Sequence, residues 1–246
     1  MLAPAVRPHA PLSPTHPCFA CEVRNEAVCG VLECGELAKL RRQGTSFRLG
    51  RGQPLFHEGD PASRVFTLTR GTLKLYKLLP DGRRQVTGFM HPGDFLGVSV
   101  EDDYAFTAEA LEQAQLCAFP RTRFDDFTQD HAQIERELYR LAAHELAAAQ
   151  QQMVLLGRKT AAERLASFFV QLARRAERVG AAPAQFVALP MSRSDIADYL
   201  GLTKETVSRV LAKLKNERLI RLETLDRVEI LDRAGLELAA DGNSEN

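Results

Sequence analysis

Residues Ser192 to Ile220 have the sequence SRSDIADYLGLTKETVSRVLAKLKNERLI, which predicts two helices joined at a glycine. Ser192 can cap the first helix, and Asp195 three residues later completes a capping-box pattern. Gly201 suits the left-handed turn that follows, and Thr203 can cap the second helix. A tight turn between two such helices predicts a helix-turn-helix. The inward apolar residues, at helical spacing, are Ile196, Ala197, Leu200, Val207, Val210, Leu211 and Leu214.

The outward face of the second helix carries polar side chains that suit the edges of base pairs. Glu205, Ser208 and Arg209 are spaced i, i+3 and i+4, so they form one patch near the helix start. In a helix-turn-helix this part of the second helix meets bases in the major groove, where arginine bonds guanine and glutamate accepts from cytosine. Lys204 and Lys213 flank the patch and suit phosphates. The alternative is a solvated helical face with an incidental Glu–Arg pair.

Charge is distributed unevenly along a chain whose formal net charge is zero. Residues 158–233 contain 15 Lys and Arg against 10 Asp and Glu, so the rest of the chain is acidic. A basic carboxyl-terminal region fits binding to double-stranded DNA. No apolar run has the length of a membrane span, and the amino terminus lacks the apolar segment of a signal peptide. We therefore expect a cytoplasmic protein that makes no membrane contact.

Four of the five cysteines lie close together near the amino terminus. Cys18 and Cys21 form a C-x2-C pair, Cys29 follows after seven residues, and Cys34 lies five further on. In the cytoplasm cysteines are metal ligands or free thiols more often than disulfides, and thiolates select zinc or iron–sulfur. Cys18, Cys21 and Cys29 need a fourth ligand, which can be Cys34 or the distant Cys117. Buried thiols without a metal are the remaining alternative, and no constellation of acid, base and nucleophile indicates an enzyme.

The remaining pattern predicts an α+β chain that begins with a β-roll. Glycine or Asp-Gly turns recur between residues 59 and 94 and separate short β-prone runs, which is typical of a roll or barrel. The predicted strands include Val65–Leu68, Leu73–Tyr76, Val86–Phe89 and Leu116–Phe119.

A helical period then predicts one long helix, and short strands complete a winged helix-turn-helix. A short strand is expected at residues 186–189, before the helix-turn-helix, and strands at 219–222 and 228–231 are expected to pair as the wing. The predicted segments are a proline-rich flexible leader (1–17), a cysteine loop with the β-roll sensor domain (18–128), the long helix (129–157), the DNA-binding domain (158–234) and a tail (235–246).

The long helix carries an apolar stripe that a second copy of the chain can cover. Self-pairing as a coiled coil would make a homodimer. Packing against the chain's own β-roll is the alternative, and both can hold on different sides of the helix. Gly157 is expected to break the helix. The stripe consists of Ile134, Leu138, Ala142, Leu146, Ala149, Met153 and Leu156.

This order of a β-roll, a long helix and a winged helix-turn-helix resembles the CRP/FNR superfamily of transcription regulators. The residues Glu205, Ser208 and Arg209 match the E-x-x-S-R triplet of its FNR branch. The resemblance implies a cyclic-nucleotide-binding-like roll, TTGAT-like inverted repeats as DNA sites, activation through RNA polymerase, and oxygen sensing. It also implies that a 4Fe–4S cluster is held by four cysteines, which correspond here to Cys18, Cys21, Cys29 and Cys117.

Other regulators of the superfamily bind cyclic nucleotides, but this chain lacks the residues for that. No arginine occurs from Val98 to Gln115, and the acidic residues Glu101, Asp102 and Asp103 would repel a phosphate. Besides the cluster, the sequence leaves open a CRP-like regulator with another effector such as nitric oxide or with no cluster, and a zinc-stapled DNA-binding or interaction protein.

Overall fold

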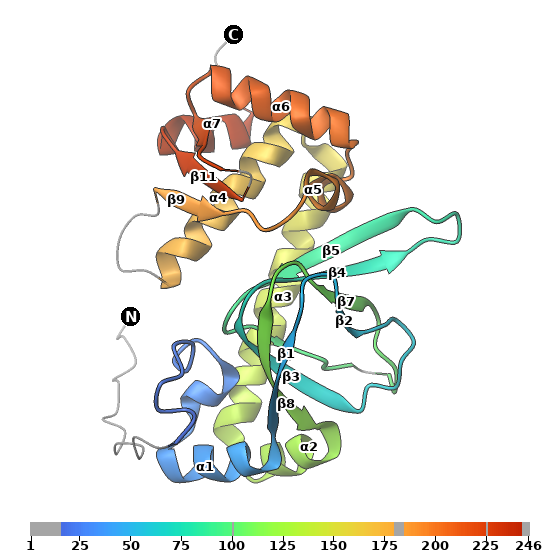
Figure 1. Ribbon diagram of the computed structural model, residues 1–246, viewed down its shortest axis with the longest axis vertical. Helices are drawn as coiled ribbons and strands as arrows, with labels where there is room; N and C mark the ends of the chain where they lie inside the picture. Colours follow the sequence, from blue (N-terminus) through green and yellow to red (C-terminus); the bar gives the residue numbers. More distant parts are fainter. Residues whose placement is uncertain (1–15, 100, 180–184, 225, 243–246) are drawn as a thin grey trace. The chain divides into compact units, whose positions relative to one another are not determined.

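The computed structural model describes residues 16–99, 101–179, 185–224 and 226–242 (Figure 1). The chain divides into two compact units. Unit 1 comprises Met1–Leu75 and Phe89–His144, and unit 2 comprises Tyr76–Gly88 and Glu145–Asn246. All but the last two residues of the predicted leader lie outside the described residues. Among the described helices, none has both the length and the apolar content needed to cross a membrane.

Unit 1 begins with the cysteine segment, which is followed by a β-roll of two four-stranded sheets. Within this roll, residues Tyr76–Gly88 are grouped with unit 2. The cysteine segment contains a short 3-10 helix η1 (Val28–Val31) and helix α1 (Cys34–Gln43), close to the predicted short helix. The first sheet has the order β1 (Thr45–Leu49), β8 (Ala114–Pro120), β3 (Arg64–Arg70) and β6 (Phe95–Leu96). The second has the order β2 (Pro54–Phe56), β7 (Thr107–Ala110), β4 (Leu73–Leu78) and β5 (Arg84–Met90).

All four strands expected in the roll are present, each slightly longer than predicted. Aromatic side chains fill the space between the two sheets. Phe56 stacks on Tyr104 with ring centroids 3.7 Å apart, and Phe66 lies 5.8 Å from Phe56. These rings belong to a buried core that includes Leu68 and Leu116.

Helix α2 (Arg121–Gln129) leads into the long helix α3 (Ala132–Arg158), which contributes residues to both units. Helix α3 ends at Arg158, one residue after Gly157, where the helix was expected to break. The next helix starts just beyond, where Thr160 and Glu163 exchange hydrogen bonds.

The first turns of α3 pack into a second core of unit 1, and this changes one predicted dimer contact. Ile134 is fully buried beside Phe124 and Phe127 of α2, and Leu138 packs against the same core. Ile134 is therefore not available to a second chain, and its assignment to the dimer seam is wrong. Packing against the chain's own roll accounts for this end of the stripe.

Unit 2 contains the winged helix-turn-helix (Figure 1). Helices α4, α5 and α6 pack around a small antiparallel sheet in the order β10-β11-β9. The register pairs Ile220 with Ile230 and Val228 with Val187, so the predicted wing is confirmed. The elements are α4 (Ala161–Val179), β9 (Phe186–Ala188), α5 (Arg193–Leu200), α6 (Lys204–Asn216), β10 (Ile220–Leu222) and β11 (Arg227–Ile230).

The predicted tail at 235–246 is wrong for most of its length, because a further helix α7 (Arg233–Asp241) occupies it. Asp232 caps α7 by accepting a hydrogen bond from the Gly235 backbone N–H at 2.9 Å. Leu236 and Ala240 are buried, and the helix packs on α4. Only residues 243–246 lie outside the described part of this segment.

Candidate functional site

Four cysteines from two distant segments line one cavity in unit 1. Cys18 and Cys21 come from the turns that precede η1, and Cys29 lies in η1. Cys117 comes from β8, where β1 and β3 flank it on both sides. Cys34, at the start of α1, does not line this cavity, and its Sγ lies 3.8 Å from Nη2 of Arg24. We call the space between the four cysteines the thiol cavity.

The walls of the thiol cavity combine apolar groups with two cations. Its apolar lining includes Val28, Leu37, Leu40 and Phe119, and the guanidinium groups of Arg24 and Arg41 line it as well. Burial, together with a smaller effect of the neighbouring thiols Cys18, Cys21 and Cys117, raises the pKa of the Cys29 thiol from 9.0 to about 12. Burial is also the largest cause of the raised pKa of both Cys18 and Cys21. The raised pKa values favour protonated thiols at Cys18, Cys21 and Cys29 at neutral pH, so a metal would have to displace these protons to bind.

The four thiols that line the thiol cavity fit an iron–sulfur cluster, because four cysteines are the usual ligands of a four-iron cluster and each thiolate binds a different iron. The thiol cavity is narrow, with a volume of about 30 Å³. The segment from Cys18 to Cys29 would have to move outward for a cluster to fit between the four thiols.

Residues beyond the cysteines hold Cys117 in place, and sequence reasoning missed them. Ser46 stands opposite Cys117 in the β1–β8 register, with its Oγ 3.7 Å from Sγ. Arg41 donates to Ser46 Oγ at 2.9 Å and to the Gly44 carbonyl at 3.0 Å. Since the Ser46 oxygen accepts from Arg41, its own hydrogen is free to point at the sulfur. Only the pairing of β1 with β8 reveals this contact, because no local motif joins these residues.

The helix-turn-helix has the caps that its sequence predicts. Ser192 Oγ accepts from the Asp195 backbone N–H at 3.1 Å, and Asp195 Oδ2 accepts from that of Ser192 at 3.0 Å. Gly201 adopts φ 62°, the left-handed conformation that ends α5. Thr203 Oγ1 accepts from the Thr206 backbone N–H at 3.2 Å and caps α6.

Helix α6 exposes the predicted patch and buries its opposite side. Val207, Val210, Leu211 and Leu214 are buried, whereas Lys204, Glu205, Ser208, Arg209 and Lys213 are exposed.

Two side chains of the patch have no internal partner. Within the described part of the chain, neither Glu205 nor Arg209 makes an ion pair or a side-chain hydrogen bond, so the incidental pair is not formed. Ser208 Oγ donates to the Lys204 carbonyl at 2.9 Å and keeps its acceptor sites. Lys213 lies 3.7 Å from Glu217 in a solvent-exposed pair, which contributes little. Both the free carboxylate and the free guanidinium are therefore available to an external partner.

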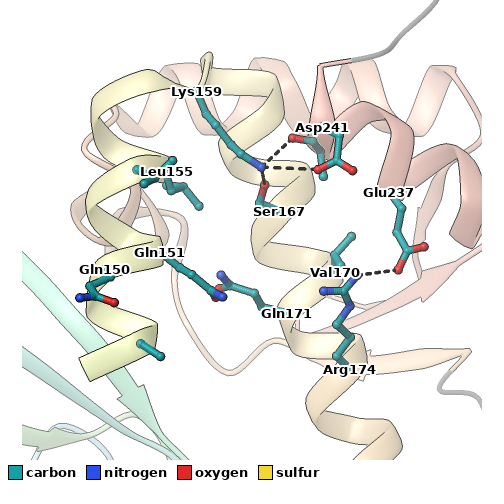
Figure 2. A pocket seen from close by; sticks show the side chains of 13 residues that line it. Gln150, Gln151, Leu155, Lys159, Ser167, Val170, Gln171, Arg174, Glu237 and Asp241 are labelled. Atoms are coloured by element: carbon teal, nitrogen blue, oxygen red, sulfur yellow. Dashed lines mark hydrogen bonds and ion pairs between the residues drawn. The ribbon is translucent and has the colours of Figure 1, made fainter. Parts of the chain in front are cut away.

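A second hollow, of about 500 Å³, lies in unit 2 between α3, α4 and α7 (Figure 2). Lys159 Nζ donates to Ser167 Oγ at 2.9 Å and to the Ala240 carbonyl at 2.8 Å. Arg174 pairs with Glu237 at 3.2 Å. Because both cations already have partners on neighbouring helices, the hollow offers little charge to a ligand. The two hydrogen bonds of Lys159 connect the segment before α4 to α4 and to α7.

The remainder of the predicted stripe on α3 is mostly exposed. Leu146 is 61% exposed and Met153 is 69% exposed, and Leu156 is half-buried. Ala142 and Ala149, which belong to the same stripe, are exposed as well. Tyr139, which is 79% exposed, extends the same face and was missed by the prediction. An apolar face of this length on one helix is unusual for a surface left in water.

The fold, with an exposed polar patch on α6, is that of a DNA-binding transcription regulator rather than an enzyme. Residues 163–239 match the model of the Crp-like helix-turn-helix domain, and residues 46–131 match that of the cyclic nucleotide-binding domain. Together with the relatives below, these matches show that the chain belongs to the CRP/FNR family of transcription regulators.

Relatives of similar length match nearly the whole chain. The nitrogen fixation regulation protein FixK of Bradyrhizobium diazoefficiens is 40% identical, over 92% of this chain and 94% of the relative. The transcriptional activator protein FnrL of Cereibacter sphaeroides is 36% identical, over 90% of each. The solved structure of FixK2 from Bradyrhizobium japonicum has a TM-score of 0.73 at 36% identity, and the match covers 79% of this chain and 96% of that one.

Proposed function

We propose that the chain is an oxygen- or redox-responsive transcription activator that binds DNA as a homodimer. The observation that carries the proposal is the convergence of Cys18, Cys21, Cys29 and Cys117 on one cavity. These four thiolates would hold a 4Fe–4S cluster, and the cluster would supply the oxygen-sensitive chemistry. The name of the relative FnrL, a transcriptional activator protein, favours an activator.

The core of unit 1 supports a route from the thiol cavity to the long helix. Cys18, Cys29 and Cys117 pack against the same buried core that contains Ile134, and Leu138 packs against it too. Outward movement of the cysteine segment would therefore change the packing under the first turns of α3. A close-packed core transmits such a change instead of absorbing it. The state of the four thiols would thereby reach the helix that carries the exposed stripe.

A second copy of the chain is the occupant that best fits the exposed stripe on α3. The stripe is apolar, repeats at helical spacing and contains small residues, which suits two identical helices packed along a two-fold axis. Leu138 and Leu156 are half-buried at its edges. The alanines make the seam shallow, which suits a dimer that a signal can weaken. The dimer contacts proposed here are Leu138, Tyr139, Ala142, Leu146, Ala149, Met153 and Leu156.

The exposed patch of α6 would read the DNA sequence. Arg209 would bond a guanine, with Glu205 and Ser208 on neighbouring pairs, and Lys204 and Lys213 would bond phosphates. Two-fold symmetry places the second recognition helix about 34 Å away, so the site would be an inverted repeat of TTGAT-like halves. RNA polymerase is the further partner that the family resemblance implies.

Iron and sulfide analysis of anaerobically purified protein tests the cofactor. We expect about four irons and four sulfides per chain, with a visible chromophore that disappears in air together with binding to the inverted repeat. A colourless protein that contains zinc would support the zinc-stapled alternative. DNA binding that is the same with and without the chromophore would contradict sensing.

A further inference from the structure

One arginine joins the ends of three helices in unit 2. Arg164 lies in the first turns of α4, and its guanidinium donates three hydrogen bonds to backbone carbonyls. Nε reaches the Lys159 carbonyl at 2.9 Å, and Nη2 reaches the Leu156 carbonyl at 2.8 Å. Nη1 reaches the Leu200 carbonyl at 2.9 Å. The acceptors therefore belong to the end of α3, the connection to α4, and the end of α5.

These three carbonyls have lost their usual helical partners. The backbone N–H of Thr160, which would bond Leu156, donates instead to Glu163. The N–H of Glu163, which would bond Lys159, donates to the Thr160 side chain. Leu200 ends α5, so no later turn of that helix follows it. A cation at two helix carboxyl ends satisfies these orphan groups and complements both helix dipoles.

A second contact ties α3 to the same end of α5. Gln152 of α3 donates from Nε2 to the Tyr199 carbonyl at 3.0 Å. Tyr199 in turn lies against Phe168 of α4, with ring centroids 5.8 Å apart. Two successive carbonyls of α5 are thus held by side chains of α3 and α4. The turn at Gly201, which leads into α6, follows directly.

We propose that Arg164 is a positioning residue that fixes the helix-turn-helix to the end of α3. In the proposed dimer, each α3 lies along the seam, so this joint sets the separation of the two recognition helices. Arg164 would then determine which spacing between half-sites the protein accepts. The inference rests on the proposed dimer and adds to it the residue that sets operator spacing.

Arginine suits this role because its planar fork presents donors in fixed directions. Lysine keeps the positive charge but has a single ammonium on a flexible stem, which cannot hold three carbonyls in one plane. Arg164→Lys therefore keeps the positive charge but removes the fixed arrangement of donors that reaches the three carbonyls. Arg174→Lys is the matched control, because Arg174 lies on the same helix and pairs only with the side chain of Glu237 among the described residues.

The test measures anaerobic DNA binding of the full-length chain by fluorescence anisotropy. The probes are an inverted repeat at the spacing that the wild type prefers, the same repeat with one base pair added or removed, and a single half-site. One base pair moves the half-sites by about 3.4 Å along the DNA. We expect Arg164→Lys to bind the preferred repeat about tenfold more weakly and to lose about threefold or more of the preference over the altered repeats. Arg174→Lys should match the wild type.

Gln152→Met provides a second variant in case Arg164→Lys does not fold. The Oε1 atom of Gln152 is buried without a hydrogen-bond partner, so methionine gives up only the bond to Tyr199. It should reduce the same spacing preference. If both folded variants keep the wild-type preference, even with weaker binding throughout, Arg164 is merely structural and the inference is wrong. A wild type that binds one half-site as well as the repeat would instead contradict the proposed dimer.

Discussion

Ser46 and Cys117 face each other across the β1–β8 pair, with Oγ and Sγ 3.7 Å apart. Arg41 donates to the same Ser46 oxygen, which leaves the serine hydroxyl hydrogen available to the sulfur. Hydrogen bonds to ligating sulfurs are among the factors that set the reduction potential of an iron–sulfur cluster. This relationship places the control of the proposed cluster in the β-roll as well as in the cysteine segment.

Ser46→Ala should make the anaerobic chromophore disappear faster in air. A bond to the thiolate stabilises the more reduced cluster, so its loss makes oxidation easier. The measurement is the decay of visible absorption after a fixed addition of air-saturated buffer. Thr45→Ala, at the exposed neighbouring position of β1, should decay like the wild type. Equal decay for all three proteins would show that Ser46 does not influence the cluster.

Cys117→Ser should abolish the anaerobic chromophore and anaerobic DNA binding together. Cys117 lines the thiol cavity and serine does not replace a thiolate ligand of iron. Cys34→Ser is the control and should retain both properties, because Cys34 does not line the cavity. Iron content and visible spectra of the two variants decide the matter. The reverse result would make Cys34 the fourth ligand.

Arg209→Ala should lose about 1–3 kcal/mol of binding free energy on the correct half-site and relax the preference for one guanine. Its guanidinium is exposed and makes no ion pair within the described residues, so substitution should leave the fold intact. Lys213→Ala is the contrasting variant. It should weaken binding to all sequences alike. The slope of log affinity against log salt concentration should become smaller by about one. An equal loss on all sequences for Arg209→Ala would make Arg209 a phosphate contact.

Ala149→Asp should convert the anaerobic protein from dimer to monomer. Ala149 is exposed in the middle of the stripe, and two carboxylates facing each other in an apolar seam would repel. Sedimentation velocity measures the change. Ala148→Asp adds the same charge to an exposed position off the stripe and should leave the dimer intact. If Ala149→Asp forms a dimer as tight as the wild type, the stripe is not the seam.

Ser192→Ala should lower the free energy of unfolding of unit 2 by about 0.5–2 kcal/mol. The change removes the oxygen that accepts from the Asp195 backbone N–H and opens the capping box of α5. Ser194→Ala, on the exposed side of the same helix, should be neutral or slightly stabilising because alanine favours helices. Urea unfolding followed by circular dichroism compares them. Similar stability of the two variants would show that the cap contributes little.

The sequence alone was sufficient for the features that depend on neighbouring residues. The caps at Ser192 and Thr203, the turn at Gly201 and the four predicted strands all follow from local hydrogen bonding and periodicity, and the structure confirms them. Helix α7 carried a comparable signal in Asp232, an N-cap three residues before Gly235, but the chain end was predicted as a tail.

Only the tertiary structure decided which distant groups meet. Nothing local distinguishes Cys34 from Cys117, and the placement of Cys117 at the thiol cavity comes from the pairing of β8 with β1 and β3. Ile134 shares the period of the exposed stripe, yet its side chain is buried in the core of unit 1 on which α3 packs. The three carbonyls that meet at Arg164 come from separate segments, and no pattern in their sequences indicates that they lie close together. Periodicity records which side of an element is apolar, whereas long-range packing decides what covers that side.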